Sequence, residues 1–108
     1  MELIDSHCHL YVPDFAADIN EVIKRAKNAG VKRFYLPAID RESESLLFDL
    51  ESRFPGECFA MQGLHPCSVK GDFSEELKRL ETSLALRKFA AVGETGLDFY
   101  WDRSFESQ

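Results

Sequence analysis

The sequence predicts an α/β protein in which parallel strands alternate with helices. Short runs of β-branched and aromatic residues recur along the 108-residue chain, and stretches with apolar residues at helical spacing separate them. Glycine or proline stands near the end of most helical stretches. Because strands joined by helices of this length pair in parallel through right-handed crossovers, we expect the order β-α-β-α-β-α-β.

The first two elements are a strand over residues 3–9 and a helix over residues 15–29. The strand is short, with apolar and polar residues interspersed. Apolar residues at helical spacing support the helix, and Gly30 stands where a C-terminal cap is needed.

The second strand is expected over residues 31–39, which are rich in β-branched and aromatic side chains. Asp40 is well placed to cap the helix that follows, and that helix ends at the breaker pair Pro55-Gly56. Its apolar face consists of Leu46, Leu47, Leu50 and Phe54. The third strand is expected over residues 58–61.

The third helix can be capped by Asp72 or Ser74. Its apolar stripe consists of Leu77, Leu80 and Leu84. Residues 88–94 are predicted to form a fourth, buried strand, and residues 102–108 offer caps for a further helix. With no repeat and no linker, residues 1–108 are expected to form a single domain.

The composition is that of an ordinary globular protein, with 44% hydrophobic and 30% charged residues. The formal net charge of −6 argues against broad phosphate binding through basic side chains. A nucleic-acid partner would therefore have to be bound by some other interaction.

Three cysteines, Cys8, Cys58 and Cys67, form no C-x-x-C pair and are expected to be buried, unreactive thiols. A disulfide scaffold is therefore disfavoured and a reducing, cytoplasmic location is expected. No apolar run approaches the roughly 18 residues that span a bilayer, and no signal-peptide pattern opens the chain, so membrane insertion and export are not expected.

His7 and His9 stand two residues apart on the first predicted strand. Side chains at this spacing leave the same face, so both imidazoles can reach one metal ion, while Cys8 points the other way. Asp5 is on the same face and is expected to orient one ring. By itself, the pair is equally compatible with two solvent-facing or hydrogen-bonded structural histidines.

Two further residues stand at the ends of predicted strands: His65 after the third strand and Glu94 at the end of the fourth. Parallel α/β folds, and barrels above all, assemble their active sites at the carboxyl ends of strands. The joint placement therefore favours a metal site with His7, His9 and Glu94 as ligands.

The segments that carry these residues, 4–9, 63–66 and 93–98, match a known family in order and spacing. Ile-Asp-Ser-His-Cys-His, Gly-Leu-His-Pro and Gly-Glu-Thr-Gly-Leu-Asp together resemble the signatures of the TatD-like metal-dependent deoxyribonucleases. The resemblance runs from residue 3 to about residue 100 and covers the first part of the family's sequence.

The resemblance implies a TIM-type (β/α)8 barrel that holds two divalent ions, Mg, Mn or Zn, and hydrolyses phosphodiester bonds in DNA. By similarity, His7 and His9 would bind one ion and Glu94 would bridge both. His65 and Asp98 would lie in the catalytic pocket as groups that position the substrate or orient the ligands. Two further histidines and an aspartate of the family's ligand set would lie beyond this chain.

The chain length also indicates part of a barrel, because a complete (β/α)8 barrel typically needs about 250 residues. The chain is expected to form the N-terminal half of such a barrel, about four β-α units, and to be incomplete as an enzyme. Open sheet edges would then favour self-association.

Two alternatives remain open. A metal-dependent hydrolase of a small amide, ester or lactone would share the fold, and the acidic net charge favours it. A non-catalytic remnant acting as a binding or assembly module is favoured by the ligands that the chain lacks.

Overall fold

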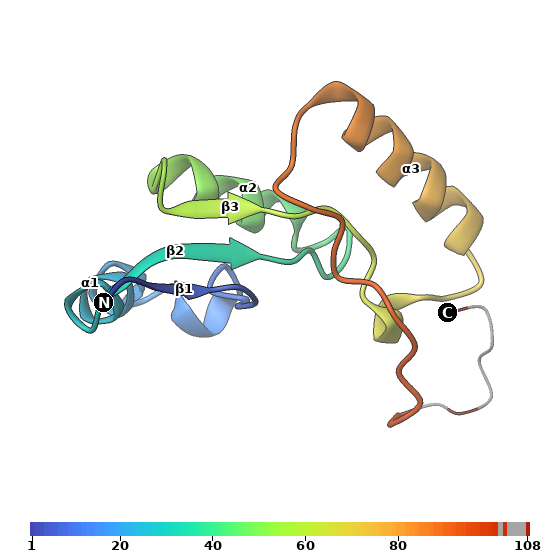
Figure 1. Ribbon diagram of the computed structural model, residues 1–108. Coiled ribbons are helices and arrows are strands. Elements are labelled where there is room, and N and C mark those ends of the chain that lie inside the picture. The colour runs from blue at the N-terminus through green and yellow to red at the C-terminus, as the bar shows by residue number, and fades with distance from the viewer. Residues whose placement is uncertain (102, 104–107) are drawn as a thin grey trace.

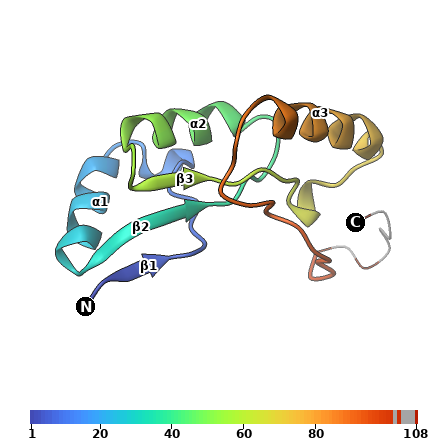
Figure 2. The same ribbon diagram turned by 45° about the horizontal axis from the view of Figure 1, so that its top comes forward.

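A computed structural model describes residues 1–101, 103 and 108, and within them the α/β prediction is confirmed (Figure 1). One parallel sheet has the order β1-β2-β3, with β1 over Leu3–Asp5, β2 over Val31–Leu36 and β3 over Cys58–Ala60. The helices are α1 (Ile19–Asn28), α2 (Glu44–Arg53) and α3 (Phe73–Leu86), with short 3-10 turns at Pro13–Phe15 and Pro66–Ser68. Figure 2 shows that α1, α2 and α3 lie on one side of the strands.

The core lies between the sheet and the helices. Phe34 and Leu36 of β2 are buried in it and pack with Leu47 of α2, which is fully buried. Alternation along a strand directs the intervening side chains to the opposite face. There Tyr35 stacks on Phe59, its partner on β3, with ring centroids 5.3 Å apart.

The predicted first strand, residues 3–9, is wrong in its second half. The regular pairing with β2 ends at Asp5, whose carboxylate accepts a hydrogen bond from the backbone amide of His7 at 3.1 Å and turns the chain. One further backbone bond to β2 follows, from the Cys8 amide to the Tyr35 carbonyl at 3.1 Å. His7 and His9 therefore follow the strand instead of standing on it.

The first helix begins at Ile19, four residues later than predicted. Pro13 starts a separate 3-10 turn that occupies the chain before it. The predicted C-terminal cap is confirmed, since Gly30 follows the last turn with a φ of +104°, where glycine is favoured.

The second strand ends at Leu36 instead of residue 39, because Pro37 has no amide hydrogen for the ladder. Asp40 acts just before α2, where its carboxylate accepts hydrogen bonds from the backbone amide (2.9 Å) and hydroxyl (2.6 Å) of Ser43. The helix ends before Gly56, which has a φ of +77°. The third strand ends at Ala60, one residue earlier than predicted.

The fourth predicted strand, residues 88–94, does not form a strand. Over the described residues it contributes one parallel bridge, between Gln62 and Val92. The reason lies one pair earlier, where the Glu51 carboxylate accepts the amide hydrogen of Ala60 at 2.8 Å. That amide is then unavailable for a continuous ladder.

The third helix begins directly after Asp72, one of its two predicted caps, although no side-chain capping bond is formed. Its predicted apolar stripe is only partly covered, because Leu80 is buried while Leu77 (52% exposed) and Leu84 (39%) are not. The predicted start of a further helix at 102–108 falls mostly outside the described residues.

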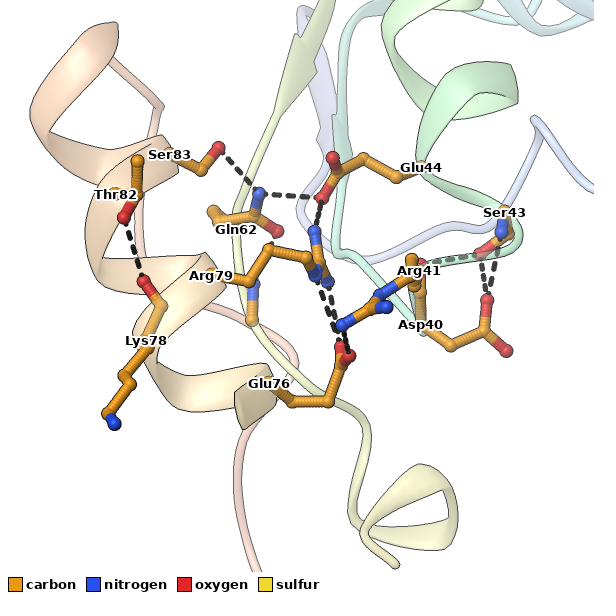
Figure 3. Close-up of polar contacts among 11 residues, drawn as sticks. Asp40, Arg41, Ser43, Glu44, Gln62, Glu76, Lys78, Arg79, Thr82 and Ser83 are labelled. Atoms are coloured by element: carbon orange, nitrogen blue, oxygen red, sulfur yellow. Dashed lines mark hydrogen bonds and ion pairs between the residues drawn. The ribbon is translucent and has the colours of Figure 1, made fainter. Parts of the chain in front are cut away.

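A polar network fastens α3 to α2 and to the end of β3 (Figure 3). The buried Gln62 amide group donates to the Glu44 carboxylate and to the Ser83 hydroxyl, both at 2.9 Å. Arg79 pairs with Glu44 and also with the buried carboxylate of Glu76. Each buried polar group thus has a partner, which is the condition for burying it without a large cost.

Two backbone segments approach closely where the chain leaves β3 and returns after α3. A Cβ atom at Gly63 would lie 2.6 Å from the carbonyl carbon of Gly93 and 2.8 Å from the amide nitrogen of Glu94. Backbone atoms cannot give way as a flexible side chain does, so this contact requires glycine at position 63.

We therefore expect Gly63→Ala to lower the free energy of unfolding by about 1–3 kcal/mol, the usual cost of overpacking. Gly71→Ala is the matched control, because a Cβ atom there meets nothing within 4 Å. Urea denaturation of both variants measures the difference, and equal losses in the two would contradict the steric argument.

Candidate metal centre

The site lies beyond the carboxyl ends of the strands, where three segments meet. In Figure 1 the segment that follows α3 crosses beyond the arrowheads of β2 and β3. Backbone hydrogen bonds hold it there: Ala38 donates to the Gly93 carbonyl at 3.0 Å, and Glu94 donates back to the Ala38 carbonyl at 3.1 Å. His65 is placed nearby by the bond from its amide to the Ile39 carbonyl, at 2.8 Å.

The Glu94 carboxylate is the centre of the cluster. All three histidines of the sequence face it. The Nε2 atoms of His7 and His9 lie 3.1 and 3.2 Å from Glu94 Oε2, and His65 Nε2 lies 3.2 Å from Oε1. The structure thus brings together four of the five predicted site residues.

The first two histidines come together by a different route from the one predicted. They lie on a turn after β1, so the alternation of strand side chains does not apply, yet the rings of His7 and His9 meet edge to face with centroids 5.1 Å apart. The expectation that Asp5 orients a ring is wrong in detail, because its carboxylate contacts the His7 backbone amide.

The electrostatic setting of His9 favours a neutral ring. Burial lowers its pKa, and this outweighs the raising effect of the Glu94 carboxylate. A neutral imidazole keeps a lone pair, which is the form that binds a metal ion.

His65 differs from the other two histidines in its hydrogen bonding. Its Nδ1 accepts the backbone amide hydrogen of Cys67 at 3.0 Å. In the neutral ring the proton is then on Nε2, which donates to Glu94 Oε1. In this arrangement His65 donates a hydrogen bond to Oε1 of Glu94, so Oε2 faces His7 and His9.

The fifth predicted site residue, Asp98, contacts the cluster indirectly. Its carboxylate lies 3.3 Å from the Cys67 thiol, and Cys67 in turn holds His65. The backbone amide of Tyr100 and the Cys67 thiol lower the pKa of Asp98, so it is ionised at neutral pH.

The cysteine expectation holds for two positions and fails for one. Cys58 is buried and Cys8 is half-buried against the core, and burial raises the pKa of each thiol to about 12. Cys67 is exposed, because the 3-10 turn after His65 directs its side chain to the surface beside Asp98.

Sequence reasoning missed Tyr11, which contacts His9. A tyrosine two residues after a candidate ligand is a weak signal. Its placement depends on the turn after β1, which the predicted strand over residues 3–9 concealed.

The donor atoms fit a divalent ion. Over the described part of the chain, His7, His9 and Glu94 offer two imidazole nitrogens and one carboxylate oxygen within 4.8 Å of one another. Ligand atoms at about 2.1 Å from a shared ion lie roughly 3 to 3.5 Å apart. The nitrogen–oxygen separations of 3.1 and 3.2 Å match that spacing.

A family model and several known proteins are similar in sequence to this chain. Residues 4–108 match the model of the family described as TatD related DNase. The chain is 32% identical to the uncharacterized metal-dependent hydrolase YabD of Bacillus subtilis, over 94% of this chain and 40% of the relative. It is also 32% identical to deoxyribonuclease TATDN3 of Homo sapiens, over 90% of this chain and 38% of the relative.

A solved structure supports the same fold. The crystal structure of YJJV, a TatD homologue from Escherichia coli, superposes with a TM-score of 0.79 at 33% identity, over 93% of this chain and 39% of that one. That neighbour is a TIM barrel, so the sheet and helices described above correspond to part of a barrel of this type. The chain spans about two fifths of the length of these relatives and belongs to the TatD-related DNase family.

Proposed function

We propose that this chain supplies one half of the active site of a metal-dependent hydrolase that cleaves phosphodiester bonds in DNA. The observation that carries the proposal is the convergence of His7, His9 and His65 on the Glu94 carboxylate. The names of the relatives support it, since they include metal-dependent hydrolases and a deoxyribonuclease.

In the proposed mechanism the residues of the chain have separate tasks. His7 and His9 would hold one cation through Nε2 together with Glu94, and Glu94 would also be the ligand that this chain offers to a second cation. His65 steadies Glu94 through Oε1, and Asp98 lies beside that loop as a group that positions substrate. Divalent cations, Mg, Mn or Zn, would supply the Lewis acidity that activates water and neutralises phosphate charge.

Cations also resolve the conflict between an acidic protein and a polyanionic substrate. With a net charge of −6 the chain has no general attraction for DNA. Bound divalent ions at Glu94 would provide the local positive charge that contacts the phosphate.

A second candidate is a non-catalytic cation-binding module, and it is supported by the fact that a second cation would have only Glu94 as a ligand from this chain. The three protein ligands of the first cation are one fewer than the four that close a structural zinc site, and they equal the number that catalytic zinc sites use, so only the second cation separates the two candidates. We also propose that residues 1–108 are one domain that contributes β1, β2, β3 and, where the fourth barrel strand was predicted, the bridge at Val92, and that full activity requires further ligands.

No helix in the described part of the chain combines the length and the apolar character needed to cross a membrane. The cytoplasmic location expected from the cysteine pattern stays a prediction.

The metal site is tested by calorimetric titration with Zn²⁺. We expect Glu94→Gln to weaken binding by more than about 100-fold, because loss of a ligand costs more than the roughly 10–100-fold loss caused by an outer hydrogen-bond partner. Glu81→Gln, at an exposed glutamate of α3, is the matched control. Equal affinity in the two variants would remove Glu94 from the site.

The nuclease proposal is tested by incubating the chain with Mn²⁺ or Mg²⁺ and single-stranded or duplex DNA. We expect slow, metal-dependent cleavage that is lost in both His7→Ala and Glu94→Ala. A wild-type chain that binds the metal ion and cleaves no DNA would favour the non-catalytic binding module. Cleavage that survives both substitutions would come from a contaminating enzyme.

We also propose that the chain associates with a second copy through its open sheet edges. Ile4, on the edge strand β1, is 56% exposed, and Val92, at the opposite edge, is 61% exposed. Unpaired edges with apolar side chains favour pairing with another chain.

Sedimentation over a micromolar concentration range tests this association. We expect the wild type to form dimers or larger species and the double substitution Ile4→Lys with Val92→Lys to shift it toward monomer. Ser52→Lys, at an exposed position on α2, is the control. A wild type that stays monomeric throughout would refute the association.

A further inference from the structure

Tyr11 connects a candidate ligand to the buried backbone. Its hydroxyl oxygen lies 3.1 Å from His9 Nδ1 and 2.5 Å from the carbonyl oxygen of Pro37. The side chain is buried, with 5% of its surface exposed, so solvent does not compete freely for these bonds.

Counting donors and acceptors determines where the protons are. A carbonyl oxygen only accepts, so the single hydroxyl proton of Tyr11 points to Pro37. The hydroxyl oxygen can then only accept from His9, which places a proton on Nδ1. In a neutral ring this leaves the lone pair on Nε2, the atom that faces Glu94 Oε2 at 3.2 Å.

Two acceptors therefore face each other across that gap. A lone pair on His9 Nε2 and a lone pair on the Glu94 carboxylate oxygen repel unless a proton or a cation lies between them. Without a partner at Nδ1, the neutral ring would instead protonate on Nε2 and donate to Glu94, which would occupy the ligand atom with a proton.

We propose that Tyr11 is a positioning residue that fixes His9 in the Nδ1–H tautomer and so presents Nε2 to a divalent cation at Glu94. His65 is held in the opposite form, because the Cys67 amide occupies its Nδ1. One carboxylate is thus flanked by a histidine prepared to bind a cation and by a histidine prepared to donate a hydrogen bond. The inference rests on the proposed metal-dependent function and assigns this division of roles within it.

Long-range ¹H–¹⁵N NMR of cation-free, ¹⁵N-labelled protein near pH 8 tests the tautomers directly. In the wild type we expect the Nδ1–H pattern for His9 and the Nε2–H pattern for His65. Either ring in the other form would overturn the proposal. This measurement needs no variant of Tyr11, so it stands even where a substitution impairs folding.

Tyr11→Phe is the decisive variant. We expect the His9 pattern to change to Nε2–H and the affinity for Zn²⁺ to fall about 10–100-fold, the usual effect of losing an outer partner of a ligand. Tyr35→Phe is the matched control, since Tyr35 lies on the sheet face and stacks on Phe59. A Tyr11→Phe protein that keeps the Nδ1–H pattern, or full affinity, would overturn the proposal.

The outcomes separate this inference from the proposed function. Wild-type protein that shows the expected tautomers and binds no Zn²⁺ would refute the metal site and leave the hydrogen-bond assignment intact. Zn²⁺ binding that depends on Glu94 but not on Tyr11 would support the metal site and refute the role of Tyr11.

Discussion

The site depends on the backbone pairing that returns the chain to the sheet after α3. Hydrogen bonds between Ala38 and the Gly93–Glu94 segment carry one carboxylate to imidazoles that stand 85 and 87 residues earlier in the sequence. The close approach at Gly63 permits that return, since a larger residue would collide with the returning backbone. Without this pairing the histidines would share no acid.

The order of elements could be predicted because it rests on local signals: helical spacing of apolar residues, a glycine after α1 and breakers after α2. The misjudged segments depend on side chains that compete for backbone amides. Asp5 takes the amide of His7 and ends β1, and Glu51 takes the amide of Ala60 and interrupts a fourth strand. Hydrophobic patterning carries no information about such competition.

The members of the site were accessible from sequence, because parallel strands end at one edge of a sheet and polar residues there converge. The geometry of the individual side chains could not be predicted from sequence. The contact of Tyr11 with His9 follows from a turn that alternation did not foresee, and the exposure of Cys67 follows from a 3-10 turn that starts at Pro66. Proton positions on the rings depend on neighbours that only the fold brings together.

Gln62 connects the helices α2 and α3 to the segment that carries Glu94. Its side-chain amide donates hydrogen bonds to Glu44 of α2 and to Ser83 of α3. Its backbone makes hydrogen bonds with the segment 91–93, directly before Glu94. The placement of Gln62 between the two helices and the placement of the segment before Glu94 therefore depend on the same residue. For this reason we expect substitutions that disturb the packing of α2 or α3 around Gln62 to alter the position of Glu94 as well.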